Sequence, residues 1–147
     1  MSDTQTLAQK GYIICRATKE QGENLEIQLN DFNTQTLGFQ GQIAELKDYI
    51  VKDGDNVIAG IRTCLNFQES LYIRILFISK DYRRQGLGSM LLKFVENGAI
   101  SSGVKLIHLN TFDFQAKDFY LKCGYEFFAT LDYYPQERKL YSLKKIL

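Results

Sequence analysis

The sequence has few of the residues that cross-link a chain or interrupt its secondary structure. It holds one proline, three cysteines and no tryptophan in 147 residues. Cys15, Cys64 and Cys123 are odd in number and far apart, which argues against a disulfide framework and a paired-cysteine metal motif. Reduced thiols of this kind are typical of a reducing compartment, so we expect a cytoplasmic protein.

Long apolar runs and a strong net charge are also missing. No segment approaches the roughly 20 apolar residues that a membrane span requires. The polar start 1–10 lacks the apolar core of a signal peptide. The formal net charge is +1, so no overall field attracts the chain to nucleic acid or to a membrane. His108 is the single histidine, which excludes a histidine-rich metal site.

The residues that are present suffice for one ordinary core. The hydrophobic fraction is 45% and the charged fraction is 24%, values typical of a globular domain. Ten phenylalanines and nine tyrosines favour a sheet with aromatic faces. We expect a single domain over 1–147, in which residues 1–11 form a loose tail.

Periodicity predicts helices and strands in alternating blocks. Helical spacing of apolar residues covers 24–36, 86–102 and 115–122, and a short helical turn is expected at 40–46. Extended stretches are 12–17, 48–52, 57–66, 71–78, 105–111, 125–131 and 138–146. Asn24 is the expected cap of the first helix, and Leu25, Leu29 and Phe32 share one of its faces. The pattern predicts an α/β fold of the α+β type, with an antiparallel meander between 48 and 78.

One turn between a strand and a helix has the composition of an anion-binding site. The strand 71–78 leads through a polar turn into Arg83-Arg84-Gln85-Gly86-Leu87-Gly88-Ser89, which opens the helix 86–102. The first N–H groups of a helix lack internal partners and carry partial positive charge, and glycine lets a phosphate come close. A plain helix cap with two solvated arginines is the alternative. The missing Gly-Lys-Ser/Thr excludes a Walker loop, and the missing third glycine argues against a dinucleotide-binding turn.

Two blocks of the sequence resemble a known family. Arg83-x-x-Gly86-x-Gly88 is similar to the Gln/Arg-x-x-Gly-x-Gly/Ala signature of the GNAT superfamily of acyl-CoA-dependent N-acetyltransferases. At the expected distance, Ala116-x-x-x-Tyr120-x-Lys122-x-Gly124-Tyr125 is similar to a second segment of that family. The resemblance covers roughly 48–147 and implies a GNAT-like mixed, mostly antiparallel sheet of about six or seven strands, flanked by helices.

The resemblance also implies acetyl-CoA as co-substrate and assigns residues to it. Backbone N–H groups of the turn would hold the pyrophosphate, at the positions Arg83, Arg84, Gln85, Gly86, Leu87, Gly88 and Ser89. The positions Phe77 and Ile78 would pair with the pantetheine arm, and their N–H groups would stabilise the oxyanion. Ala116 and Tyr120 complete the cofactor-binding set. The thioester is expected between the strands 71–78 and 105–111.

The sequence assigns the general acid more directly than the general base. Tyr120 matches a tyrosine that protonates the leaving thiolate in many family members, with a core tyrosine as the alternative. Some members carry a catalytic carboxylate on the strand before the signature, but here Tyr72 and Arg74 occupy those positions. The base is therefore open between Asp113, Asp132 and a chain of water molecules. Asp113 equally fits a helix cap and Asp132 a turn residue.

The remaining polar candidates favour structural roles. His108 lies within a strand, and Cys123 has no partner base in view. The loop 133–135 fits acceptor docking, plain packing or a homodimer contact. The sequence thus predicts an N-acetyltransferase in which a primary amine of a small molecule or peptide attacks acetyl-CoA directly in a ternary complex. A non-catalytic CoA-binding regulatory module is the alternative, and a longer acyl group also stays open.

Overall fold

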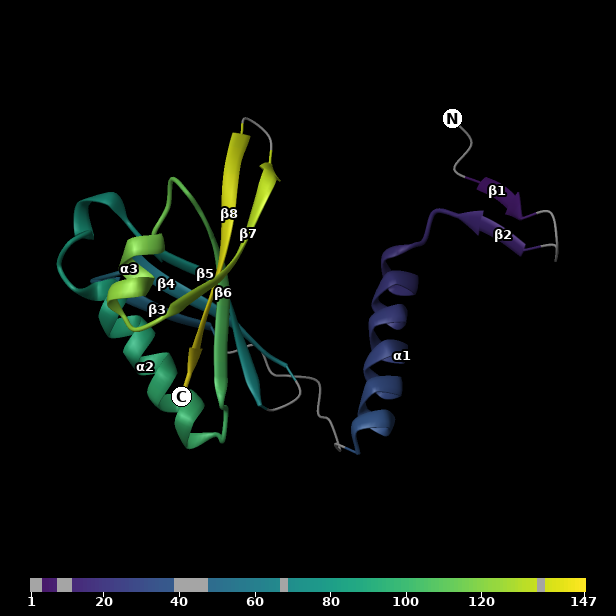
Figure 1. The fold of residues 1–147 in the computed structure, drawn as a ribbon, viewed down its shortest axis with the longest axis horizontal. Helices are drawn as coiled ribbons and strands as arrows, with labels where there is room; N and C mark the ends of the chain where they lie inside the picture. Colours follow the sequence, from purple (N-terminus) through teal and green to yellow (C-terminus); the bar gives the residue numbers. More distant parts are fainter. Residues whose placement is uncertain (1–3, 8–11, 39–47, 67–68, 135–136) are drawn as a thin grey trace. The chain divides into compact units, whose positions relative to one another are not determined.

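The computed structural model describes residues 4–7, 12–38, 48–66, 69–134 and 137–147 (Figure 1). The chain divides into two compact units, Met1–Gly41 and Gln42–Leu147, each described here by itself. The helical turn expected at 40–46 lies outside the described residues, and so do the side chains of the loop 133–135. A single domain over 1–147 stays a prediction.

The N-terminal unit contains a two-stranded sheet and one helix. Strand β1 (Thr4–Leu7) pairs antiparallel with β2 (Tyr12–Cys15), with Thr4 opposite Cys15 and Leu7 opposite Tyr12. Residues 4–7, part of the segment expected to be a loose tail, thus form a strand, and the tail over 1–11 stays a prediction. The tail hypothesis weighed the polar composition of this segment, but backbone hydrogen bonding between paired strands does not require apolar side chains.

Helix α1 (Lys19–Leu37) begins earlier than the sequence pattern predicted. Its N-cap is Thr18 rather than Asn24: the Thr18 hydroxyl accepts from the Gln21 N–H at 3.2 Å, and the Gln21 side chain accepts from the Thr18 N–H at 2.8 Å. This reciprocal capping box satisfies two N–H groups, and it lies six residues before Asn24. Gly38 ends the helix with φ of 70°. No residue of α1 is buried.

The C-terminal unit is built on a six-stranded sheet in the order β3-β4-β5-β6-β8-β7. Its strands are β3 (Asp48–Asp53), β4 (Asn56–Asn66), β5 (Ser70–Ile78), β6 (Leu106–Phe112), β7 (Glu126–Tyr134) and β8 (Arg138–Ile146). All neighbours pair antiparallel except β5 and β6, which are parallel. The predicted mixed α+β fold and the predicted meander β3-β4-β5 are confirmed.

Two helices complete the core on one face of this sheet (Figure 1). Helix α2 (Leu87–Ser101) buries the residues Leu91, Leu92, Val95 and Ala99. They pack with inward residues of four strands, namely Ile61, Ile73, Ile107, Leu109 and Leu143. The short helix α3 (Lys117–Lys122) adds Tyr120 to the same cluster. This packing sets the position of the first turn of α2, and of the side of α3 that carries Tyr120, relative to β5 and β6.

The beginning of α3 differs from the prediction of 115–122. The helix starts at Lys117, and its N-cap Ala116 makes no side-chain hydrogen bond. The Gln115 side chain turns back and accepts from the Phe112 N–H at 2.8 Å, which closes the turn before the helix. Asp113 therefore does not cap this helix, because its carboxylate faces β8 instead, where Arg138 and Lys139 lie.

Within the described ranges, each helix is too short or too polar to cross a bilayer. The same residues contain no group of three His, Cys, Asp or Glu side chains arranged to hold a metal ion.

Candidate active site

The strands β5 and β6 pair over only half of their length. Pairing runs from Ser70 opposite Leu106 to Ile73 opposite Leu109 and stops there. The rest of β5, Arg74–Ile78, pairs with β4 alone among the described residues. We call Ser70–Ile73 the paired half and Arg74–Ile78 the open half of β5. The open half leaves one row of backbone N–H and C=O groups facing a gap in the sheet.

A bulge in β5 lies at the point where the two strands separate. Ile73 stands opposite Thr63 of β4, but Ile75 stands opposite Arg62, so Arg74 is an extra residue without a register partner. A bulge bends its strand and turns the extra side chain out of the regular alternation. The bulge thus explains the separation of the strands and directs Arg74 into the opening.

The gap continues into a cavity of about 630 Å³. It extends from the bulge to the start of α2 and is lined by Ile73, Arg74, Ile75, Leu76, Phe77, Ile78, Arg83, Gly88, Asn110, Thr111, Phe114, Gln115, Ala116, Phe119 and Tyr120. No described residue of this lining is Asp or Glu, whereas two are arginine. The cavity is therefore positively charged, with apolar walls contributed by β5 and α3.

The end of the cavity nearest Ile78 is formed by the first turn of α2. Gly86 is the N-cap with φ of 84°, a left-handed conformation that favours glycine, and no side chain caps the helix. A Cβ on Gly88 would lie 3.2 Å from Cζ of Phe119, so glycine there lets α2 approach α3 closely. The N–H groups of Leu87, Gly88 and Ser89 precede the first intrahelical bond. N–H groups in this position at the start of a helix are suited to an anion.

Hydrogen bonds from two side chains hold the turn before α2 in place. Arg83 donates through Nε to the Ile78 carbonyl at 3.0 Å, and Gln85 donates to the Asp81 carbonyl at 3.2 Å. Arg84 has φ of 61°, an uncommon conformation for a residue with a Cβ. The positions predicted to bind the cofactor, Arg83 to Ser89, therefore follow one another through this turn into the first turn of α2. Their roles stay predictions.

Tyr120 is buried at the wall of the cavity opposite β5. It is 6% exposed and packs edge-on against Phe119 and Tyr125 at ring-centroid distances of 5.1 Å and 5.7 Å. Its hydroxyl makes no hydrogen bond to any described residue, so it is available to a ligand. Burial, with a smaller effect of the nearby Cys123 thiol, raises the pKa of Tyr120 to about 12. The phenol is therefore protonated, and a hydrogen-bond donor, throughout the neutral range.

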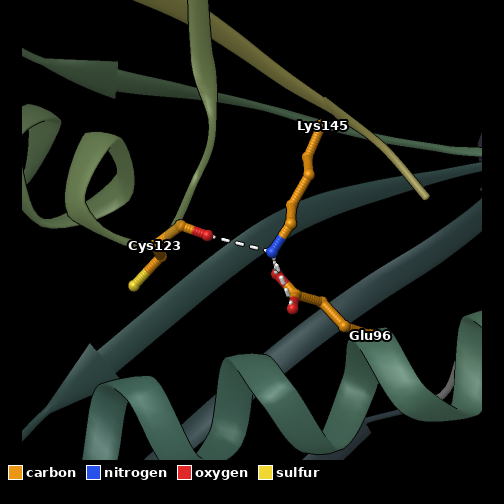
Figure 2. Close-up of polar contacts among 3 residues, drawn as sticks. All are labelled: Glu96, Cys123 and Lys145. Carbon is orange, nitrogen blue, oxygen red and sulfur yellow. Dashed lines mark hydrogen bonds and ion pairs between the residues drawn. The ribbon is translucent and has the colours of Figure 1, made fainter.

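A partly buried lysine fixes the end of α3, as Figure 2 shows. Lys145 Nζ donates to both carboxylate oxygens of Glu96 at 3.0 Å and 2.9 Å, and to the Cys123 carbonyl at 2.9 Å. The ion pair joins β8, α2 and the last turn of α3, with side-chain exposure of 25% for Lys145 and 13% for Glu96. Sequence reasoning missed this pair. The sequence did contain a signal for it. Lys145 follows Leu143 by two residues in β8, so both side chains lie on the same, inward face of the strand.

The hydroxyl of Tyr125, next to this pair, is the buried side-chain oxygen that lacks a hydrogen bond among the described residues. Burial, followed by the negative charge of Glu96, raises the pKa of Tyr125 far above its usual value.

Neither carboxylate considered as a general base reaches the cavity. Asp113 Oδ1 lies 3.8 Å from Arg138 Nη1, and its Oδ2 accepts from the Lys139 N–H at 3.4 Å. Asp132 is exposed and lies 3.8 Å from Lys139 Nζ. Both are paired with cations of β8 and are not part of the cavity lining. The structure therefore does not bring them together with Tyr120.

A row of polar side chains lies where the strands separate. Ser142 donates to Asn110 Oδ1 at 2.7 Å, and Asn110 Nδ2 lies 3.4 Å from the Tyr72 hydroxyl. The Tyr72 ring contacts His108 at a centroid distance of 4.9 Å, and partial burial lowers the pKa of His108. His108 is a neutral sheet residue at pH 7, and of this row only Asn110 lines the cavity.

Comparisons with known proteins agree with this geometry. A family model described as an acetyltransferase (GNAT) domain matches residues 46–127, more than half of the chain. An acetyltransferase structure from Bacillus cereus is similar at 28% identity and a TM-score of 0.81, covering 91% of this chain and 96% of that one.

Two further solved structures share the fold. Naa50 from Arabidopsis thaliana, in complex with the bisubstrate analogue CoA-Ac-MVNAL, is 26% identical with a TM-score of 0.60 over 67% of this chain and 71% of that one. The ribosomal-protein-S18-alanine N-acetyltransferase of Escherichia coli is 19% identical with a TM-score of 0.63, over 80% and 75%. No curated protein matched the chain. The resemblance in the sequence is confirmed by the family model, and the chain belongs to the GNAT family of acetyltransferases.

Proposed function

We propose that this acyltransferase moves the acetyl group of acetyl-CoA to a primary amine by direct attack within a ternary complex. The observation that carries the proposal is a single cavity that joins the open half of β5 to the free N–H groups of α2. A nucleotide thioester needs both: an anion site for its diphosphate and backbone partners for its amide-bearing arm. The likeness to Naa50, solved with a CoA-containing bisubstrate analogue, supports the same ligand here.

We assign the parts of acetyl-CoA to successive positions along β5. We assign the pyrophosphate to the turn Arg83–Ser89 and the pantetheine arm to the backbone of Phe77 and Ile78, with Ala116 on the opposite wall. At roughly 3.3 Å per residue, the bulge at Arg74 lies about 13 Å along β5 from Ile78. The acetyl group then lies beside Phe77, between the proposed diphosphate site and the bulge.

The chemistry proposed at this point needs three groups of the chain. The amine nitrogen attacks the thioester carbon, and backbone N–H groups near Phe77 and Ile78 stabilise the negative charge on the oxygen. As the C–N bond forms and the C–S bond breaks, the Tyr120 hydroxyl donates its proton to the departing thiolate. A phenol with a pKa of about 12 remains protonated until that step. The proton from the amine leaves through water, because Asp113 and Asp132 are paired elsewhere.

Two substitutions test the assignments separately. Gly86→Asp places a carboxylate at the proposed diphosphate site and is expected to abolish CoA binding in calorimetry. Tyr120→Phe removes the proton donor and is expected to lower kcat by about 100-fold or more while CoA affinity is unchanged. Unchanged CoA affinity of Gly86→Asp would contradict the binding site, and an unchanged kcat of Tyr120→Phe would contradict the acid.

The absence of a carboxylate from the described cavity lining favours a second candidate. A regulatory module that binds CoA without turnover needs no general base. Thiol release from acetyl-CoA in the presence of an amine panel separates the two functions, since the module binds CoA and releases none above the spontaneous rate.

A further inference from the structure

We infer that Arg74 selects an acceptor amine that carries an anionic group, such as a carboxylate or a phosphate. The inference rests on the proposed function and extends it to the class of acceptor. It starts from the charge of the cavity, whose described lining contains Arg74 and Arg83 and no acidic side chain. A polycationic acceptor bound there meets two guanidinium groups and no counter-charge, which costs binding free energy.

The two arginines lie at opposite ends of the cavity and have different partners. Arg83 donates to the Ile78 carbonyl beside the start of α2, where the diphosphate is expected. Arg74 lies four residues earlier on β5, about 13 Å away along the strand. Arg74 thus lies away from the proposed diphosphate site, at the end of the cavity beyond the proposed thioester.

Arg74 also has no ion-pair partner among the described residues, in contrast to comparable cations of the same unit. Arg62 on the neighbouring strand binds Asp48 at 2.8 Å, Lys105 binds Glu69 at 2.7 Å, and Lys145 binds Glu96. For Arg74, no carboxylate of the described residues lies within ion-pair distance. Its position as the bulged residue of β5 places it in the cavity without a charge to neutralise it.

A guanidinium in this setting is suited to a planar or tetrahedral anion. Arginine presents several N–H donors in a fixed fork and binds carboxylate or phosphate through two parallel hydrogen bonds. An acceptor anchored in this way keeps its amine on the side of the thioester. The Asn110 side chain, which also lines the cavity and is oriented by Ser142, offers a further polar contact on the β6 side.

The experiment compares amines that differ only in the anion. Thiol release is measured with α-amino acids, their carboxamides, aminoalkyl phosphates, the matching amino alcohols and polyamines. The expected result is a kcat/KM at least tenfold higher for the anionic member of each pair, the range typical of a charge-assisted hydrogen bond.

Arg74→Gln is expected to remove this preference by raising KM for anionic acceptors, while KM for neutral acceptors and for acetyl-CoA is unchanged. Arg62→Gln is the matched control, because Arg62 lies on the adjacent strand, is paired with Asp48 and does not line the cavity. The control keeps the preference of the wild type.

Other outcomes overturn the inference in recognisable ways. Equal rates with polyamines and anionic amines reject the acceptor class while the transferase function stands. A rise in KM for acetyl-CoA in Arg74→Gln instead assigns the guanidinium to the co-substrate. CoA binding without acetylation of any amine rejects both the acceptor class and the proposed function.

Discussion

The two halves of β5 have similar sequences and opposite roles. In the paired half, Leu71 and Ile73 are 8% and 2% exposed, whereas Ile75 and Phe77 in the open half are 48% and 55% exposed. The same apolar residue types thus differ in exposure because the bulge at Arg74 shifts the alternation: Leu76 and Ile78 pack against the core, while Ile75 and Phe77 are exposed at the cavity. The difference teaches that strand register and pairing, more than residue type, decide which residues of β5 pack in the core and which are available to a ligand.

The largest test of this comparison replaces the same residue in each half. Ile73→Ala is expected to lower the free energy of unfolding by about 2–5 kcal/mol, because it leaves a hole in a filled core. Ile75→Ala, two positions along on the exposed side, is expected to cost less than about 1 kcal/mol. Urea unfolding of both variants measures the difference. Equal losses would mean that the open half is packed as tightly as the paired half.

A second test asks whether the ion pair of Lys145 and Glu96 positions Tyr120 of α3, which lines the cavity along the open half. Lys145→Met leaves Glu96 and the Cys123 carbonyl without their shared donor, with an expected loss of roughly 1–3 kcal/mol, moderated by partial exposure. If the pair positions Tyr120, kcat also falls, and it falls no further when Lys145→Met is added to Tyr120→Phe. Lys144→Met, the adjacent residue on the other side of β8, is the control and leaves kcat and stability nearly unchanged. Additive losses of kcat in the double variant would assign the pair a purely structural role.

The smallest expected effect is a loss of stability at alkaline pH from Tyr120, which lines the cavity along the open half. Burial raises the pKa of Tyr120 from 10.0 to about 12, so the unfolded chain releases this proton first. Stability is therefore complete below pH 10 and declines as pH rises towards 12, by about 1 kcal/mol for this group at pH 11. Urea midpoints at pH 8, 10 and 11 measure the slope. Tyr120→Phe reduces it, and a slope that is the same in the variant would contradict the burial of the phenol.

Sequence reasoning reached the fold because its signals were local. Alternation located the strands of the C-terminal unit, and the glycine turn at Arg83–Ser89 identified the family. The start of α1 was missed even though the pattern Thr18-x-x-Gln21 is local, since the apolar stripe was given more weight.

Features that depend on contacts between distant segments could not be predicted from local sequence patterns. The pair of Glu96 and Lys145 joins residues far apart in the chain, and neither neighbourhood alone specifies a partner. The bulge at Arg74 is a mismatch of register between two strands, which a single strand cannot reveal. Asp113 and Asp132 likewise form ion pairs with residues of β8. Only the structure therefore shows that neither carboxylate lines the cavity.

The one-sided pairing of the open half couples the occupancy of the cavity to the stability of the sheet. Backbone groups of the open half that pair with no second strand among the described residues can take an amide-bearing ligand as a partner in place of water. A molecule that binds there completes the sheet as an additional strand would, and by mass action it favours the folded chain over the unfolded one. Under the proposed function, the co-substrate would be a temporary structural element, present during catalysis and lost with each departing thiol.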